Sequence, residues 1–382
     1  MILWAWLAAT CSHYGQPVKT GAECTDDYFP LLKDRRIAVM SNHTGMVNGE
    51  HLVDMLHREG FQLTAIFSPE HGFRGTADAG EHVSDSRDEK TGIPVFSLYT
   101  GKDRKPGAEL MQLFDVMIID LQDVGLRFYT YHISMIRLMD ACAEYGKQLI
   151  VLDRPNPNGH CVDGPTLDMK HRSGVGWIAV PVVHGMTLGE LARMVNGEKW
   201  LPEGRVCDLT VIKCRNYTHR TMYRLPVAPS PNLPNMKSVY LYPSVCLFEG
   251  TVMSLGRGTA FPFQVYGHPD MKGCSFSFTP QSVPGAGNPP LLGQLCRGVD
   301  LRNIPDEEIL QKGVDLSYII HAYRNLNIGD RFFTPFFEKL TGRDYVREMI
   351  REGRTAEEIR AVWKDDVEEF RVRRRPYLLY EE

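Results

Sequence analysis

The sequence lacks the short motifs by which phosphate, metal and redox sites are usually recognised. No Gly-x-Gly-x-x-Gly or Walker-type loop follows the first expected strand, because residues 42–45 (NHTG) supply one glycine and no lysine. His-Glu-x-x-His and Cys-x-x-Cys are absent too, and no two histidines have the spacing of ligands on one helix face. We therefore expect no dinucleotide, no other cofactor and no resident metal.

A concentration of charge of one sign is also missing. The net charge is −4, and 43 basic and 47 acidic residues are interspersed along the chain. The single basic run, Arg371–Arg375, comes at the end of an expected helix, where cations complement the helix dipole. This distribution offers no surface for an anionic polymer, so we expect no nucleic-acid partner.

An apolar, uncharged run at residues 1–9 (MILWAWLAA) is too short to cross a membrane as a helix. It resembles the hydrophobic region of a secretion signal that lacks its basic start. Cys11 follows Leu-Ala-Ala-Thr, which is a loose lipid-attachment pattern. We expect residues 1–22 to be a signal or targeting segment and the protein to reach the periplasm or cell envelope. A lipid anchor at Cys11 is the only membrane contact we expect.

From residue 36 onward, short β-branched runs alternate with helical patterns. The expected strands are 37–41, 63–67, 94–98, 116–119, 148–152 and 209–212. The expected helices are 50–59, 107–113, 133–145 and 187–195. Continuous apolar strands separated by helices indicate a parallel sheet covered on both faces, which is a Rossmann-like α/β architecture.

A proline-rich passage at residues 226–243 interrupts this alternation, and we place the domain boundary there. Residues 23–236 are expected to form the Rossmann-like catalytic domain, and residues 237–382 a smaller α+β domain that closes the cleft. A capping box at residues 355–358 predicts a terminal helix. Its apolar stripe consists of Ile359, Val362, Trp363 and Phe370.

Polar clusters follow four of the expected strands. They are residues 42–45 (NHTG), 68–72 (SPEHG), 120–123 (DLQD) and 153–157 (DRPNP). Open parallel sheets bind ligands beyond the carboxyl ends of their strands, and these ends meet at one edge. Four polar clusters at one edge exceed what turns require, so the sequence predicts a functional site there.

Three of these clusters carry carboxylates, which favours acid–base chemistry. Glycoside hydrolysis uses a carboxylic acid of raised pKa on the leaving oxygen and a second carboxylate as base or nucleophile. Glu70, with His71 beside it at a strand end, is the favoured acid because burial there would raise its pKa. The candidates for the second carboxylate are Asp120, Asp123 and Asp153.

Four arginines that could meet a substrate are more than a neutral sugar requires, and an acidic substrate would give several of them a bidentate partner. They are Arg74, Arg127, Arg154 and Arg257. The other candidate substrate-binding residues are Asn42, Tyr129, Asn156, His184 and Glu249.

Several segments of the chain resemble the exo-β-N-acetylmuramidase family, called NamZ-like. The first are 41–45 (SNHTG), 67–75 (FSPEHGFRG), 120–131 (DLQDVGLRFYTY) and 152–159 (LDRPNPNG). The others are 181–192 (PVVHGMTLGELA), 247–259 (LFEGTVMSLGRGT) and 370–380 (FRVRRRPYLLY). Occurring in order from about residue 35 onward, they cover nearly the whole remaining chain.

The resemblance implies an exo-acting glycoside hydrolase that releases N-acetylmuramic acid from the non-reducing ends of peptidoglycan fragments. It also implies a cleft between the two domains, with Glu70 as the favoured catalytic residue. The lactyl carboxylate of muramic acid would explain the surplus of arginines. The expected partners are therefore muramic-acid-terminated saccharides derived from peptidoglycan.

Two other functions remain open at this point. A metal-dependent phosphoesterase could use Glu70, Asp120 and Asp123 as ligands, and a non-catalytic wall-binding module could retain the sugar without cleaving it. For the glycosidase we expect one of the three aspartates within about 5–10 Å of the Glu70 carboxylate. We also expect the Gly256-Arg257-Gly258 loop to close the cleft, since its glycines permit close backbone approach.

Overall fold

A seven-stranded sheet organises the first half of the chain in the computed structural model, which describes residues 16–69, 73, 86–98 and 105–382. The strand order is β5-β6-β4-β1-β7-β8-β9, and only the edge strand β5 runs antiparallel to its neighbour. The strands are β1 (Ile37–Ser41), β4 (Leu63–Ser68), β5 (Ser86–Arg87), β6 (Pro94–Ser97), β7 (Val116–Asp120), β8 (Gln148–Leu152) and β9 (Asp208–Ile212).

The central strands are buried along their whole length. Every residue of β1 (IAVMS) and β7 (VMIID) is buried, as parallel strands with helices on both faces require. Each of the six expected strands lies within one residue of its predicted bounds. The Rossmann-like fold class is therefore confirmed.

The helices of this half are α1 (Thr25–Leu32), α2 (Leu52–Arg58), α3 (Ala108–Met111), α4 (Tyr131–Tyr145) and α5 (Leu188–Gly197). A capping box between Thr187 and Glu190 starts α5. The helix expected from residue 50 begins two residues later. Strands β2 (Met46–Val47) and β3 (Glu50–His51) form a small hairpin instead, because Asn48 and Gly49 adopt positive φ in its turn.

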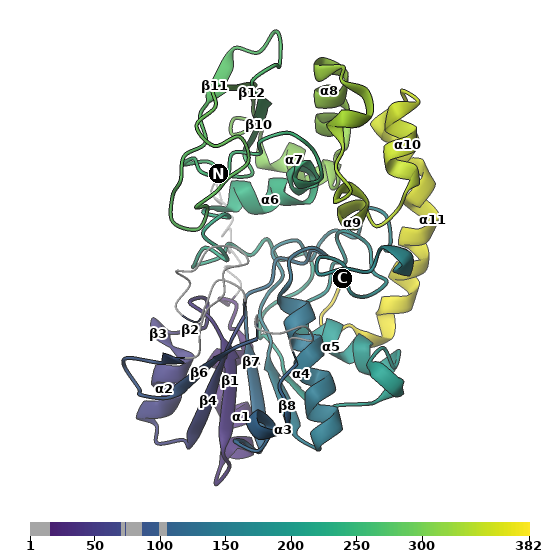
Figure 1. Cartoon of the computed structure of the whole chain (residues 1–382). Coiled ribbons are helices and arrows are strands. Elements are labelled where there is room, and N and C mark those ends of the chain that lie inside the picture. Colours follow the sequence, from purple (N-terminus) through teal and green to yellow (C-terminus); the bar gives the residue numbers. More distant parts are fainter. Residues whose placement is uncertain (1–15, 70–72, 74–85, 99–104) are drawn as a thin grey trace, which may run out of the picture.

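The second half of the chain combines helices with a small antiparallel sheet of order β10-β12-β11, as the expected α+β class requires. The strands are β10 (Val265–His268), β11 (Phe276–Phe278) and β12 (Cys296–Asp300), and the helices are α6 (Met236–Val245), α7 (Asp306–Lys312), α8 (Ser317–Leu326), α9 (Phe337–Thr341), α10 (Tyr345–Arg351) and α11 (Ala356–Arg374). Figure 1 shows most of this part above one edge of the large sheet.

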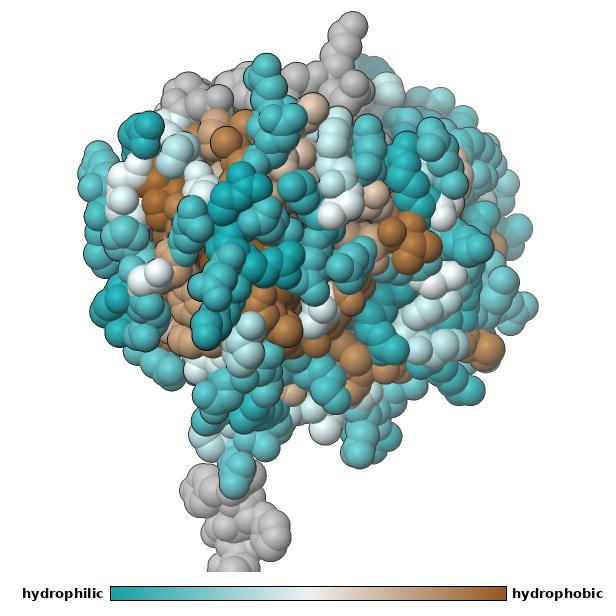
Figure 2. All heavy atoms as spheres, turned by 90° about the horizontal axis from the view of Figure 1, so that it is seen from below, coloured by the Kyte–Doolittle hydropathy of each residue, from teal (hydrophilic) through white to brown (hydrophobic). Residues whose placement is uncertain are grey.

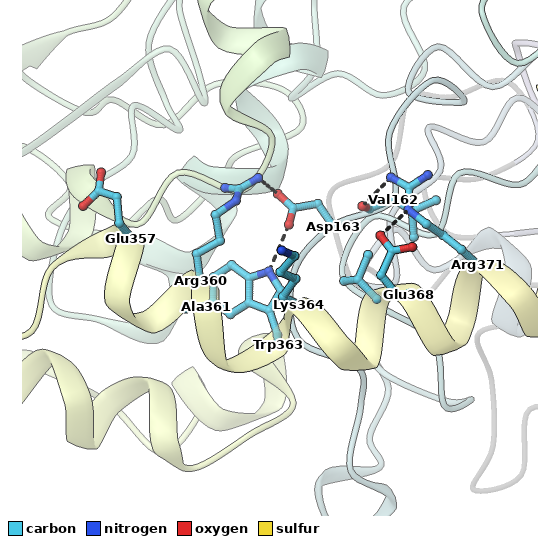
Figure 3. Close-up of a pocket in the computed structure, with 10 residues that line it drawn as sticks. Val162, Asp163, Glu357, Arg360, Ala361, Trp363, Lys364, Glu368 and Arg371 are labelled. Carbon is cyan, nitrogen blue, oxygen red and sulfur yellow. Dashed lines mark hydrogen bonds and ion pairs between the residues drawn. The ribbon is translucent and has the colours of Figure 1, made fainter.

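Helix α11 joins the two halves, since it descends from the second part to lie beside α5 (Figure 1). Its buried face is formed by Ile359, Trp363, Val367 and Phe370. The expected member Val362 is instead 48% exposed. The Trp363 indole donates a 2.9 Å hydrogen bond to Asp163 of the first half, and Arg360 forms an ion pair with the same carboxylate (Figure 3).

A cavity of about 340 Å³ lies beside these contacts, between α11 and residues 162–163. Its charged lining consists of three cations and three anions, Arg360, Lys364, Arg371, Asp163, Glu357 and Glu368. Figure 3 shows that Asp163 and Glu368 each interact with one of these arginines. With charges balanced and mostly paired, the cavity selects neither an anion nor a cation.

The amino-terminal edge of the sheet is the side seen in Figure 2, where hydrophilic residues cover most of the surface and hydrophobic ones show between them. The exposed ion pair of Arg36 and Asp115, which precede β1 and β7, lies at this edge. Within the described ranges, no helix is both long and apolar enough to cross a membrane.

Candidate functional site

The carboxyl edge of the sheet gathers buried polar side chains. Asn42 follows β1, Asp120 ends β7, and Asp153 follows β8, and all three are at most 1% exposed. Strand β4 lies next to β1, so the chain leading to Glu70 reaches the same edge. Glu70, His71 and Arg74 themselves lie outside the described residues, and their expected functions stay predictions.

Asp120 forms a buried, bidentate ion pair with Arg154. The guanidinium donates from Nε to Oδ1 at 2.6 Å and from Nη2 to Oδ2 at 3.0 Å. Arg154 also donates to the carbonyl of Met46 in the hairpin. Both carboxylate oxygens of Asp120 are thus occupied by Arg154. This geometry gives the two residues a structural function and leaves Asp120 poorly suited to hold a metal or attack a sugar.

Asp153 is also fully engaged. It accepts hydrogen bonds from Thr187 Oγ1 (2.6 Å), from the Gly189 amide (2.9 Å) and from the Tyr380 hydroxyl (2.6 Å). Burial raises its pKa to about 6, although these donors oppose the shift. The carboxylate therefore fastens the start of α5 and the C-terminal segment to the end of β8.

Asp123 differs from the other two aspartates. Its Oδ1 accepts a 2.6 Å hydrogen bond from the Gly125 amide, whereas Oδ2 is buried with no partner among the described residues. Burial raises the pKa of this carboxyl to about 7. Asp123 is therefore the one of the three whose carboxyl keeps an oxygen without a partner among the described residues, and it can gain or lose a proton near neutral pH.

Asn42 and two tyrosines connect the edge to the segment between the two halves. The Asn42 amide donates to Tyr131 Oη at 2.8 Å, and Tyr129 Oη donates to the carbonyl of Pro229 at 2.7 Å. The rings of Tyr129 and Tyr131 meet edge to face, with centroids 4.8 Å apart. Burial raises the pKa of Tyr129 well above its ordinary value, so its hydroxyl is a poor nucleophile.

The buried interior of the protein contains three further candidates, Arg127, Asn156 and His184. Arg127 is fully buried and donates to the carbonyls of Pro165, Val180 and Leu340. This position corrects the expectation that Arg127 meets a substrate carboxylate, because no ligand can reach its guanidinium.

Asn156 and His184 are buried too. The Asn156 side chain donates to the carbonyl of Met186 and accepts from the Asn158 amide. His184 Nδ1 accepts from the Met186 amide, and burial holds the pKa of this histidine well below its ordinary value. Both side chains bond to the backbone of Met186, and neither is placed to transfer a proton.

From the second half, Glu249 and Arg257 form an ion pair at 2.5 Å. The Arg257 guanidinium lies 5.0 Å from the centre of the Phe263 ring. In the Gly256-Arg257-Gly258 loop, the backbone of Gly258 lies close to Gln281 of the same half, since a Cβ on Gly258 would lie 2.3 Å from the carbonyl oxygen of Gln281. Glu70 lies outside the described residues, so closure of this loop over Glu70 stays a prediction.

Both halves of the chain match one family. Residues 37–237 match the family described as "Exo-beta-N-acetylmuramidase NamZ, N-terminal", and residues 240–380 match its C-terminal counterpart. The chain belongs to the NamZ exo-β-N-acetylmuramidase family. The resemblance found in the sequence motifs is thereby confirmed.

Relatives of known name or structure share this NamZ architecture. The chain is 39% identical to the peptidoglycan beta-N-acetylmuramidase NamZ of Bacillus subtilis over 95% of this chain and 91% of that protein. Two DUF1343 family proteins of Bacteroides fragilis have crystal structures that superpose with TM-scores of 0.90 and 0.80. The first is 62% identical and covers 96% of this chain, and the second is 29% identical and covers 95% of it. In both cases the match extends over 99% of the crystallised chain.

Proposed function

We propose that the protein is an exo-acting glycoside hydrolase that releases N-acetylmuramic acid from the non-reducing ends of peptidoglycan fragments. The observation that carries this proposal is the match of both halves of the chain to the NamZ family. The B. subtilis relative is a peptidoglycan muramidase by name, and its similarity extends over 95% of this chain.

In this proposal Glu70 protonates the leaving oxygen and Asp123 supplies the second carboxyl. The arrangement of the described aspartates supports Asp123, because Arg154 occupies both oxygens of Asp120 and three donors occupy Asp153. A separation near 5 Å between the two carboxyl groups favours a covalent nucleophile and retention, and one beyond about 6.5 Å favours inversion through a water.

The deciding experiment incubates the purified protein with a disaccharide that carries N-acetylmuramic acid at its non-reducing end. Free N-acetylmuramic acid, detected by mass spectrometry, is the expected product. Binding of the disaccharide without cleavage would make the protein a wall-binding module. Loss of turnover on adding a chelator, restored by a divalent metal, would favour the metal-dependent alternative.

We further propose that the protein acts in the cell envelope after export. The apolar run at residues 1–9 and Cys11 support this proposal. Both lie outside the described residues. Fractionation of cells that express the full chain tests it, and labelling with a radioactive fatty acid tests lipid attachment at Cys11.

A further inference from the structure

The ion pair of Glu249 and Arg257 is partly exposed, unlike the other charged groups of the site. The two side chains are 23% and 20% exposed, whereas those of Arg154 and Asp120 are 4% and 0% exposed. Glu249 lies in the 3-10 helix Cys246–Gly250, directly after α6. Arg257 lies between Gly256 and Gly258, which both adopt positive φ, so the turn presents its side chain toward Glu249.

This pair keeps unused hydrogen-bonding capacity. Nε and Nη2 of Arg257 both donate to a single oxygen, Glu249 Oε1, at 2.9 and 2.5 Å. Among the described residues, no group accepts from Arg257 Nη1 and none donates to Glu249 Oε2. An arginine offers five N–H donors in a planar fork, so the free side of Arg257 can still bind a second carboxylate.

A chain of aromatic rings links the pair to the loop that follows β7 at the carboxyl edge of the sheet. Phe263, which Arg257 contacts, packs on Tyr242 of α6 with ring centres 4.8 Å apart. Tyr242 in turn lies 6.2 Å from Tyr129, ring centre to ring centre. Tyr129 follows Asp123 by six residues in the loop after β7. Packed rings therefore link the pair to the loop after β7, which also carries Asp123.

The charges around Arg257 fix it as a cation. Burial lowers the pKa of its guanidinium, but the Glu249 carboxylate more than offsets this effect, and the net shift is upward. The arginines closer to the sheet are already used, because Arg154 binds Asp120 and Arg127 binds three carbonyls. Arg257 is thus the described arginine of the site with both exposure and a free donor.

We propose that Arg257 recognises the lactyl carboxylate of the muramyl residue and that Glu249 is the positioning residue that holds its guanidinium in place. This inference rests on the proposed function. A charge-assisted hydrogen bond from the free side of the guanidinium selects a sugar with a carboxylate over N-acetylglucosamine, which lacks it. Glu249 balances the charge of Arg257 while the site is empty.

The test compares two chromogenic substrates, the p-nitrophenyl β-glycosides of N-acetylmuramic acid and of N-acetylglucosamine. We expect Arg257→Met to lower kcat/KM for the muramyl glycoside about ten- to a hundredfold and to leave that for the glucosaminyl glycoside nearly unchanged. Methionine keeps the length of the side chain and its contact with Phe263. Arg36→Met is the matched control, because Arg36 also donates from Nε and Nη2 to one carboxylate but lies at the opposite edge.

A change to the substrate gives a second readout that needs no folding control. Converting the lactyl carboxylate to its methylamide removes the negative charge, so wild-type protein is expected to lose about the same factor on the amide. Arg257→Met is expected to hydrolyse acid and amide at similar rates. Should that variant fail to fold, Arg257→Gln, which lacks the positive charge, takes its place in the same comparison.

The outcomes separate this inference from the function on which it rests. Wild-type protein that does not hydrolyse the muramyl glycoside would overturn the proposed function. Wild-type protein that hydrolyses it, together with an Arg257 variant that keeps the full preference for acid over amide, would overturn only the assignment of Arg257.

Discussion

The two edges of the large sheet use charge in opposite ways. At the amino-terminal edge, Arg36 and Asp115 pair in solvent, with side chains 42% and 37% exposed. At the carboxyl edge, Arg154 and Asp120 pair in the same bidentate manner but are 4% and 0% exposed. Exposed pairs stabilise little, whereas buried ones must repay a large desolvation cost. At the carboxyl edge, this desolvation cost accompanies a fixed arrangement of buried polar groups.

The largest effect should come from the carboxyl edge. We expect Glu70→Gln to lower kcat on muramyl substrates by about 10²–10⁴, because the amide cannot donate the acid's proton. The melting temperature and the affinity for the sugar should stay close to wild type. Steady-state kinetics and calorimetry measure the two effects. Glu59→Gln, an exposed glutamate at the end of α2, is the control. Retention of more than a tenth of the activity would move the acid to another residue.

Breaking the buried pair should remove much of the free energy that stabilises the folded state. Asp120→Asn leaves the Arg154 guanidinium buried without its counterion, and we expect a loss of about 3–5 kcal/mol in the free energy of unfolding. Urea denaturation followed by circular dichroism measures it. A loss no larger than that of a surface substitution would show that water enters the edge and solvates Arg154.

The pH dependence of stability sharpens the contrast between Asp123 and its neighbours. Burial raises the pKa of Asp123 to about 7 in the folded protein, whereas the unfolded carboxyl titrates near 3.8. Between these values the folded state binds the extra proton, so this group makes stability fall as pH rises from about 4 to 7. Its contribution to the slope is at most about 1.4 kcal/mol per pH unit.

Asp123→Asn removes this titration, and its urea midpoint should decline less between pH 4 and pH 7 than that of wild type. Asp153, with a folded pKa of about 6, still contributes to the decline in both proteins. Parallel pH profiles for the variant and the wild type would mean that Asp123 titrates as an ordinary exposed carboxyl.

The smallest effect should come from the exposed edge. Asp115→Asn removes the partner of Arg36, but solvent takes its place on the guanidinium. We expect no shift in the urea midpoint beyond experimental error and unchanged kcat/KM. A loss comparable to that of Asp120→Asn would erase the distinction between the edges.

The sequence was sufficient to predict the sheet and the polar residues that gather at its carboxyl edge. Both predictions depend on local signals, namely continuous apolar strands and the polar residues that follow them. The hydrogen-bonding partners of those polar residues could not be predicted from the sequence, because they come from distant segments of the chain. Tyr380 reaches Asp153 across 227 positions, and Leu340 reaches Arg127 across 213. No local pattern distinguishes an aspartate that such a donor will occupy from Asp123, one oxygen of which has no partner in the described part of the chain.

One of those distant partners bears on how the protein is made. On the ribosome, residues 37–212 of the sheet emerge long before Tyr380 does, and until then the buried Asp153 lacks one of its three donors. The last turn of α11 adds a second late contact, from Arg374 to the carbonyl of Gly185. The buried polar arrangement at the carboxyl edge is therefore completed only when synthesis of the chain is nearly over. A nascent fragment that stops before residue 380 is expected to be an incomplete enzyme.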